Sequence, residues 1–118
     1  MAPDNSSDID VLELILELGS LARGQVRDTS FETFAMDRTE VDAAAYRLMS
    51  IGEASRSLSA GFKARHPSQR WAAMYAMRNV LAHSYRTVIP ERIWDVIQDD
   101  LDDLLAVCEQ ELKRLLRE

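Results

Sequence analysis

The sequence predicts an all-α fold, a four- to five-helix up-and-down bundle built as one domain. Leu and Ala contribute 14 residues each, whereas Val, Ile and Thr together contribute 17 of 118. Straight-chain residues and Ala favour helices because they lose little side-chain entropy there. Only three prolines and four glycines interrupt the chain. Apolar residues make up 47 % and recur at helical spacing, which is enough to form a single hydrophobic core.

Residues 1–7 are expected to be a disordered lead, and residues 8–118 are expected to form the helical domain. Ser7 or Asp8 would cap a first helix that ends near Arg27, because both side chains accept hydrogen bonds from backbone amides of a first turn. Five apolar residues share one face of this helix and predict its buried side: Ile9, Leu12, Ile15, Leu16 and Ala22.

The next stretch, Asp28-Thr29-Ser30, predicts a break followed by a capped short helix over residues 31–36. A long helix is then predicted from Arg38 to Gly61, since glycine commonly marks a helix end. Its inner face is predicted to consist of Val41, Ala44, Ala45, Leu48, Ile51, Ser55, Leu58 and Phe62.

Residues 62–70 are expected to form a loop around His66-Pro67-Ser68. A third long helix starts near Gln69 or Arg70 and continues to about Ala82. Pro90 is a natural first-turn residue and predicts the start of the last helix. Acids early and bases late in that helix complement its dipole. Its apolar seam is predicted to be Trp94, Ile97, Leu101, Leu104, Cys108 and Leu115.

Several classes of protein are excluded by composition and missing motifs. The single cysteine, Cys108, excludes an intrachain disulfide and a cysteine-rich zinc site. The chain has no glycine-rich phosphate loop, no HExxH and no Gly-x-Ser-x-Gly, and we expect no cofactor. No secretory signal and no membrane-spanning run is visible, so we expect a soluble cytoplasmic protein.

The net charge of −6 argues against nucleic acid when taken alone, but its distribution does not. The part of the chain from Ala54 to Pro90, here named the basic segment, holds six cations and no Asp or Glu, and the remainder carries −12. Solvation of the chain ends by acidic helices accounts for the sorting equally well. The cations expected to bind RNA are Arg56, Arg70 and Arg86.

His83 is the strongest candidate for chemistry because Arg78 and Tyr85 accompany it. A base that titrates near neutral pH, a fixed cation and a phenol suit phosphoryl chemistry. The alternative is structural, with Arg78 and His83 capping helix carbonyls and Tyr85 acting as a half-buried anchor. His66 is expected to be a surface histidine without a partner.

On a continuous helix Arg78 and His83 would point about 140° apart. Either the helix ends before His83, or the site is assembled from more than one chain. A two-fold dimer would supply two histidines, one as general base and one as general acid.

The acids of the last helix and Glu53 are further candidates for a functional role. Asp95, Asp99, Asp102 and Asp103 of the last helix suggest a metal site, but acid runs of this kind usually form a solvated face. Glu53 points away from the main apolar stripe, so that it is either solvated or paired with a nearby arginine.

The run from Arg78 to Tyr85 resembles the R-x4-H-x-Y motif of the HepT-like branch of HEPN domains, the toxin half of HEPN–MNT toxin–antitoxin pairs. The resemblance covers roughly residues 9–107. Further landmarks occur in the order typical of the family: Ile51-Gly52-Glu53-Ala54, His66-Pro67, Trp71, Trp94 and Asp100-Leu101.

The resemblance implies an all-helical homodimer and a metal-independent endoribonuclease with its cleft at the dimer interface. Arg78 and His83 would be the catalytic pair, supported by Asn79 and Glu53. Tyr85 would accept AMP from a partner minimal nucleotidyltransferase, the antitoxin. The alternative function is a non-catalytic helical scaffold that binds RNA or a partner and serves as a nucleotidylation target.

The sequence departs from the family pattern at two positions. Arg70 stands where a proline is common before the tryptophan, and Ala76 replaces a common glycine. Neither position belongs to the motif, but Ala76 could alter how closely two helices approach.

Overall fold

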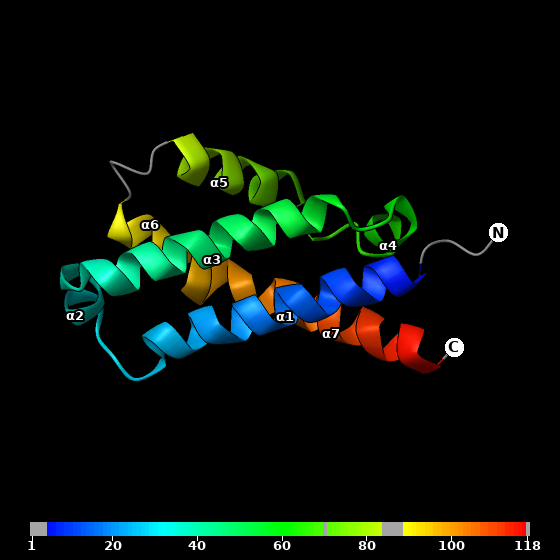
Figure 1. Cartoon of the computed structure of the whole chain (residues 1–118), viewed down its shortest axis with the longest axis horizontal. Helices are drawn as coiled ribbons and strands as arrows, with labels where there is room; N and C mark the ends of the chain where they lie inside the picture. The colour runs from blue at the N-terminus through cyan, green and yellow to red at the C-terminus, as the bar shows by residue number, and fades with distance from the viewer. Residues whose placement is uncertain (1–4, 70, 84–88, 118) are drawn as a thin grey trace.

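The computed structural model describes residues 5–69, 71–83 and 89–117, with the backbone alone at residues 5–7, 73, 77, 80, 82 and 83. Within these ranges the chain is helical with short connections, which confirms the all-α fold class. The molecule is elongated, about 50 × 29 × 22 Å, and its long helices alternate in direction (Figure 1). Across the described parts of the chain, no helix has both the length and the apolar character of a membrane span.

Three helices enclose the core: α1 (Asn5–Arg27), α3 (Arg38–Arg56) and α7 (Leu101–Arg117). Helix α1 packs against both α3 and α7 along its length (Figure 1). Leu12, Ile15 and Ala22 of the predicted stripe are fully buried, while Ile9 and Leu16 are partly buried. The helical spacing of apolar residues therefore identified the inner face of α1 correctly.

Helix α2 (Phe31–Met36) closes one end of the bundle and begins and ends as predicted. The Ser30 hydroxyl accepts a hydrogen bond from the Thr33 amide (3.1 Å), which is the expected N-cap. Phe34 is buried, and its ring lies 5.6 Å from that of Trp94. A local cap and one aromatic anchor are sufficient to define this short helix.

The prediction of one helix from Arg38 to Gly61 was wrong. Helix α3 ends at Arg56, and a separate helix α4 (Ala60–Arg65) contains Gly61. The Ser59 hydroxyl caps α4 by accepting from the Phe62 amide (3.2 Å). A new helix therefore begins after Ser59 instead of α3 continuing through it. Leu58 and Phe62 are nevertheless buried as predicted, because the chain folds back across the same core.

The predicted cap of the first helix was also wrong. Helix α1 begins at Asn5, so residues 5–7 of the expected lead belong to it, while residues 1–4 lie outside the described structure. The Asp8 side chain is buried and accepts from the Ser59 amide (3.1 Å) and hydroxyl (2.8 Å). Asp8 therefore ties α1 to the α3–α4 connection, a long-range role that local sequence does not show.

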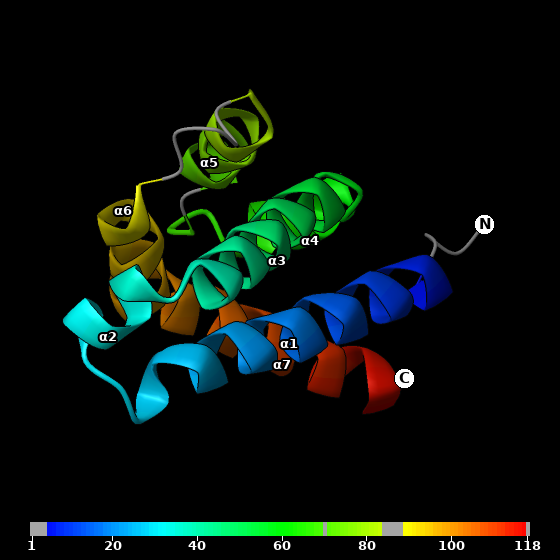
Figure 2. The ribbon, with the colours of Figure 1, turned by 60° about the vertical axis from the view of Figure 1, so that its left-hand side comes forward.

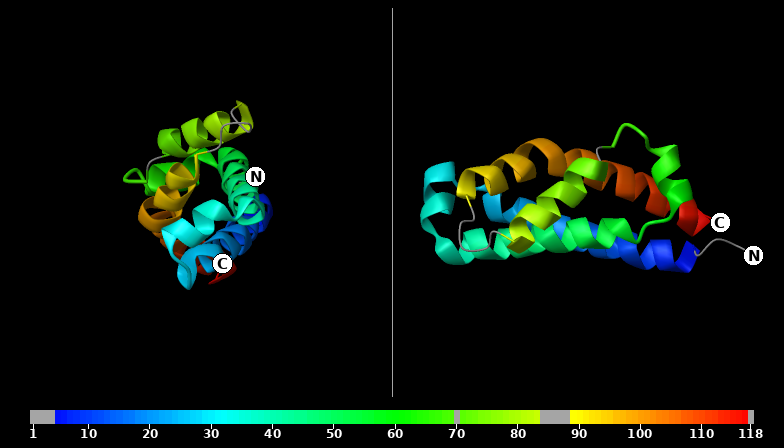
Figure 3. Two further views of the ribbon diagram at one scale, coloured as in Figure 1. Left: turned by 90° about the vertical axis from the view of Figure 1, so that its left-hand side faces the viewer. Right: turned by 90° about the horizontal axis from the view of Figure 1, so that it is seen from above.

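Helix α5 (Trp71–His83) lies on α3, on the side away from α1 (Figure 2). Seen from above, α5 crosses α3 obliquely (Figure 3). The predicted start near residue 70 is confirmed to within a residue, and the helix extends one residue beyond the predicted end at Ala82.

The last helix is not one uninterrupted α-helix. Helix α6 (Pro90–Asp95) starts with proline in the first turn, as predicted, and passes through a π-helical segment η2 (Val96–Asp100) into α7. Periodicity did not predict the wide turn, although the seam is buried: Ile97, Leu101, Leu104, Cys108 and Leu115. Trp94 is partly buried against this core.

A buried carboxylate connects α7 to the α4–α5 connection. Glu111 is 2 % exposed, forms an ion pair with Arg65 and lies 2.7 Å from Arg114 Nη2. His66 Nε2 lies 3.5 Å from the same carboxylate. Burial alone would raise the pKa of Glu111, but the hydrogen bonds and charge of Arg114, Arg65 and His66 outweigh it and lower that pKa from 4.5 to about 2. Glu111 is therefore ionised and paired in the folded protein.

We expect Glu111→Gln to lower the free energy of unfolding at pH 7 by about 2–3 kcal/mol, because it leaves Arg65 and Arg114 without their shared anion. Since folding lowers the pKa of Glu111, its contribution is complete above pH 4.5 and is lost as the pH falls through about 2. Urea unfolding at a series of pH values would show the two proteins converging towards pH 2.

Glu109→Gln is the matched control, since Glu109 forms an exposed ion pair with Lys113 four residues along the same helix. We expect no comparable loss there. A difference between Glu111→Gln and wild type that persisted undiminished at pH 2 would contradict the role of the ionised carboxylate.

Candidate functional site

Helices α3 and α5 pack tightly against each other at Gly52. A Cβ atom placed on Gly52 would lie 2.7 Å from Arg78 Cβ and 3.1 Å from the Met74 carbonyl oxygen. Any side chain at this position would therefore push α5 outwards. Glycine at position 52 sets where the first residue of the R-x4-H-x-Y motif lies.

The Arg78 guanidinium is held on this contact by two neighbours. Its Nε lies 2.8 Å from Glu53 Oε2, and its Nη1 donates to Asn79 Oδ1 (3.2 Å). The ion pair was one of two alternatives that the sequence left open for Glu53. The Arg78 side chain is 29 % exposed and that of Glu53 is 57 % exposed. The Arg78 side chain is therefore oriented and partly exposed, although its Nε atom is buried and makes no hydrogen bond of good geometry.

The backbone around His83 decides one question that the sequence left open. Helix α5 includes every residue from Arg78 to His83, so it does not end before the histidine. Along a continuous helix these two residues point about 140° apart. The His83 side chain itself lies outside the described structure, as do Tyr85, Arg86 and Arg70. The backbone positions of Arg78 and His83 in one chain therefore lie about 140° apart around α5.

The other sequence candidates are distributed as follows. Arg56 is exposed in the last turn of α3, three residues after Glu53 and therefore on the same side of that helix. Ala76 is exposed on α5 and does not lie at the close approach. The glycine that sets the helix spacing is Gly52 on α3, and the sequence of α5 alone does not show it.

The prediction of a partnerless surface histidine at position 66 was wrong. His66 is 16 % exposed and contacts the Glu111 carboxylate. Its ring lies 5.1 Å from that of Phe62, and its carbonyl accepts from Trp71 Nε1 (3.2 Å). The acid that pairs with it is 45 residues away, so sequence spacing gave no signal. His66 belongs to the structural cluster and not to the Arg78 site.

The acids of the last helix and the single cysteine are not part of the Arg78 site. Asp95, Asp99, Asp102 and Asp103 are exposed, as expected of a solvated face, and Asp102 lies 3.0 Å from Arg23 Nε. Burial raises the pKa of the Cys108 thiol to about 12, so it stays protonated and unreactive.

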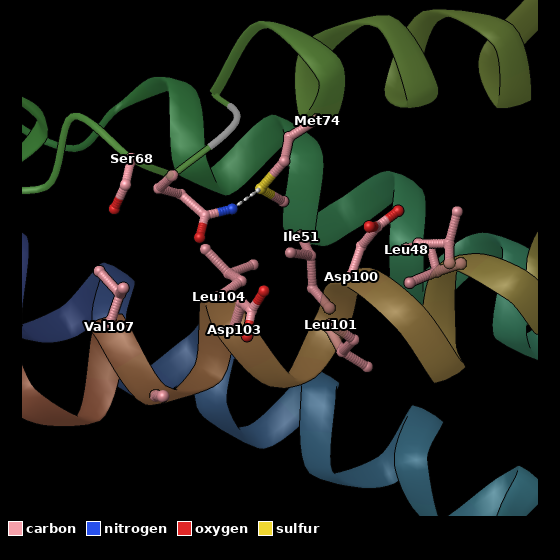
Figure 4. A pocket seen from close by; sticks show the side chains of 12 residues that line it. Leu48, Ile51, Ser68, Met74, Asp100, Leu101, Asp103, Leu104 and Val107 are labelled. Atoms are coloured by element: carbon pink, nitrogen blue, oxygen red, sulfur yellow. Dashed lines mark hydrogen bonds between the residues drawn. The ribbon is translucent and has the colours of Figure 1, made fainter.

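A pocket of about 620 Å³ lies between α3, α5 and α7 (Figure 4). Its walls are largely apolar, with Leu48, Ile51 and Leu104 among them, and Asp100 and Asp103 add carboxylates. Two carboxylates and an apolar wall do not suit a phosphate. Arg78 and Glu53 do not line the pocket, so the candidate anion site lies outside it, on the α3–α5 contact.

Comparison with known proteins agrees with the motif. A family model described as ribonuclease HepT-like matches residues 11–111. The chain is 35 % identical over 101 residues to the "Probable ribonuclease HepT" of Thermococcus cleftensis, covering 86 % of this chain and 92 % of that protein. It is also 31 % identical over 106 residues to a Caldanaerobacter subterraneus protein that is named as an RNase. That match covers 90 % of this chain and 91 % of the other protein. No solved structure matches the chain significantly.

Gly52→Ala is expected to lower the free energy of unfolding by about 1–2 kcal/mol, because the new methyl group collides with Arg78 Cβ and a backbone carbonyl. The loss occurs even though alanine is the better helix former by about 1 kcal/mol. Urea unfolding measures the change.

Gly24→Ala provides the matched control, since Gly24 is an exposed helical glycine with no atom near its added Cβ. We expect this substitution to stabilise the protein by up to about 1 kcal/mol. If Gly52→Ala raised the free energy of unfolding as Gly24→Ala is expected to do, the α3–α5 contact at Gly52 would not be tight.

Proposed function

Because the chain belongs to the HepT-like ribonuclease family of HEPN proteins and is thereby an endoribonuclease, we propose that Arg78 and His83 are its catalytic residues. The observation that supports this most directly is the placement of Arg78. Its side chain belongs to the basic segment, is oriented by Glu53 and Asn79, and is 29 % exposed. RNA is the substrate, and we propose that the enzyme acts in the cytoplasm as the toxin of a toxin–antitoxin system.

The proposed reaction uses a nucleophile that RNA itself carries. His83 accepts the proton of a ribose 2′-hydroxyl, and the 2′-oxygen attacks the adjacent phosphorus. The bond from phosphorus to the 5′-oxygen of the next nucleotide breaks, and that oxygen receives a proton from a general acid. Arg78 stabilises the negative charge that develops on the phosphoryl oxygens. Since no water has to be activated, the mechanism requires no metal ion.

The general acid is proposed to be the His83 of a second chain. Each chain offers one histidine in the motif, and the continuous helix α5 keeps Arg78 and His83 of one chain off a common face. A two-fold dimer whose cleft contains both copies of the motif supplies a base and an acid together. The helical backbone through His83 favours this arrangement over a site within one chain.

Regulation is proposed to act through Tyr85, the last residue of the motif. The support is the spacing of Tyr85 from His83, which matches the family pattern, since Tyr85 lies outside the described structure. A partner minimal nucleotidyltransferase would transfer AMP from ATP to the phenol oxygen and release pyrophosphate. The added phosphate would repel RNA and occupy the cleft.

In excess EDTA, wild-type protein is expected to cleave single-stranded RNA. Arg78→Ala and His83→Ala are each expected to reduce kcat/KM at least about 100-fold, since one loses charge stabilisation and the other loses proton transfer. Gel analysis of a labelled oligoribonucleotide measures the rates.

Arg38→Ala is the control, because Arg38 is an exposed arginine paired with Asp42 on another part of α3. Equal cleavage by all four proteins would indicate a contaminating nuclease. For the shared cleft, heterodimers of wild-type and His83→Ala chains should have well below half the activity of the wild-type dimer. A monomer by sedimentation that cleaves at the full rate would contradict it.

Incubation with the cognate nucleotidyltransferase and ATP is expected to increase the intact mass of the chain by AMP and to abolish cleavage. Tyr85→Phe should show no increase, because it lacks the acceptor oxygen. An AMP adduct that persisted in Tyr85→Phe would exclude Tyr85 as the target, and Tyr46→Phe, which removes a phenol 63 % exposed on α3, is the control.

A further inference from the structure

Lys63 of α4 is held in place by two groups that carry no charge. Its Nζ lies 5.1 Å from the centroid of the Tyr75 ring and donates to the Arg56 carbonyl (3.4 Å). An ammonium group has three donors, so these contacts leave at least one donor for a ligand. A long side chain that would otherwise sample many rotamers is thereby oriented before any ligand binds.

No carboxylate lies within 4.0 Å of Lys63 Nζ among the residues that the structure describes. Two other cations of the basic segment differ from it, because Arg65 is paired with Glu111 and Arg78 with Glu53. A positioned cation without a counter-ion attracts an anion more strongly than a cation whose charge is already compensated. Lys63 is therefore available to an anion without breaking an ion pair.

The position of Lys63 relative to Arg78 follows from helix geometry. Tyr75 precedes Arg78 by three residues on α5, and Arg56 follows Glu53 by three residues on α3, so each pair shares a helix face. Helices α3 and α5 run in opposite directions, so going from Arg78 back to Tyr75 and going from Glu53 on to Arg56 lead towards the same end of this helix pair. Helix α4 lies at that end (Figure 1). Lys63, which contacts Tyr75 and Arg56, lies about one helical turn beyond the Arg78–Glu53 pair.

Tyr75 acts through its ring and not through its hydroxyl. The hydroxyl oxygen is buried and makes no hydrogen bond with any described residue. A buried hydroxyl without a partner destabilises the fold, so the contact through which Tyr75 orients Lys63 is that of its ring face with the ammonium. Tyr75 is a positioning residue for Lys63.

We propose that Lys63 binds a backbone phosphate of single-stranded RNA, one that flanks the phosphodiester at the Arg78 site. The RNA strand would run along α5, with Tyr75 holding the Lys63 ammonium and the exposed Arg56 adding a second positive charge. The inference rests on the proposed function, which places the cleaved bond at Arg78 and His83. A phosphodiester is the matching ligand because Lys63 and Arg56 both belong to the basic segment, and the charge of Glu53, which lies on the same side of α3 as Arg56, is compensated by Arg78.

The test uses the fact that the chain contains two lysines, Lys63 and Lys113. Lys63→Gln and Lys113→Gln change the net charge equally, and Lys113 is an exposed residue of α7 paired with Glu109. Binding of a fluorescent 2′-O-methyl oligoribonucleotide of about ten residues, which cannot be cleaved, is measured by anisotropy at several salt concentrations. A dinucleotide with one phosphodiester is measured as a competitor of the same probe.

Lys63→Gln is expected to raise the Kd of the oligonucleotide about three- to tenfold and to reduce its salt dependence by about 0.7 in log–log slope, the effect of one phosphate contact. The dinucleotide should bind both variants equally. Tyr75→Ala should weaken oligonucleotide binding in the same way, whereas Tyr75→Phe should bind like wild type. With cleavable RNA, Lys63→Gln should raise KM and leave kcat unchanged.

Equal Kd values and salt slopes for Lys63→Gln and Lys113→Gln would overturn the subsite, even if wild-type protein cleaves RNA normally. Equal weakening of the dinucleotide and the oligonucleotide would also overturn it, because Lys63 would then act at the cleaved bond itself. Lys63-dependent binding by a wild-type protein that cleaves no RNA would support the subsite and refute the proposed catalytic function. The two ideas therefore fail on different measurements.

Discussion

The contact between Gly52 of α3 and Arg78 of α5 is the constraint on which the geometry of the candidate site depends. Because position 52 has no Cβ, the two helices approach until Arg78 Cβ occupies the space that a side chain would fill. That approach brings the guanidinium beside Glu53. The same crossing places Tyr75, in the preceding turn of α5, against Lys63 of α4. A backbone contact thus positions charged groups on three helices.

Two described cations of the basic segment, Arg65 and Arg78, form ion pairs that differ in the burial of the acid. Glu111 is buried, so its carboxylate must be paired, and Arg65 provides a structural ion pair. Glu53 is exposed, so its attraction to Arg78 is partly screened by water. The Lys63 ammonium contacts an aromatic ring and a backbone carbonyl, and no described carboxylate lies within 4.0 Å of it. Part of the clustered positive charge is therefore committed to folding, and the proposed function uses the remainder to bind RNA.

Predictions from the sequence succeeded where the cause is local. The Ser30 cap, the short helix after it and the buried stripe of α1 follow from residues within one or two turns of one another. They failed where the partner is distant. Asp8 pairs with Ser59 and not with its own first turn, and His66 pairs with an acid on α7. The five-residue π-helical segment was missed because the apolar spacing on either side of it fits an ordinary helix.

By itself the sequence determined the all-α class, the residues of the core and the motif from Arg78 to Tyr85, because composition, periodicity and short motifs are properties of neighbouring residues. It also showed the sorting of charge along the chain. Only the tertiary structure decided which cations are free to bind an anion, since that depends on acids brought in from other helices and on how closely those helices pack. Gly52 was visible from the start, but its importance comes from the helix that lies across it.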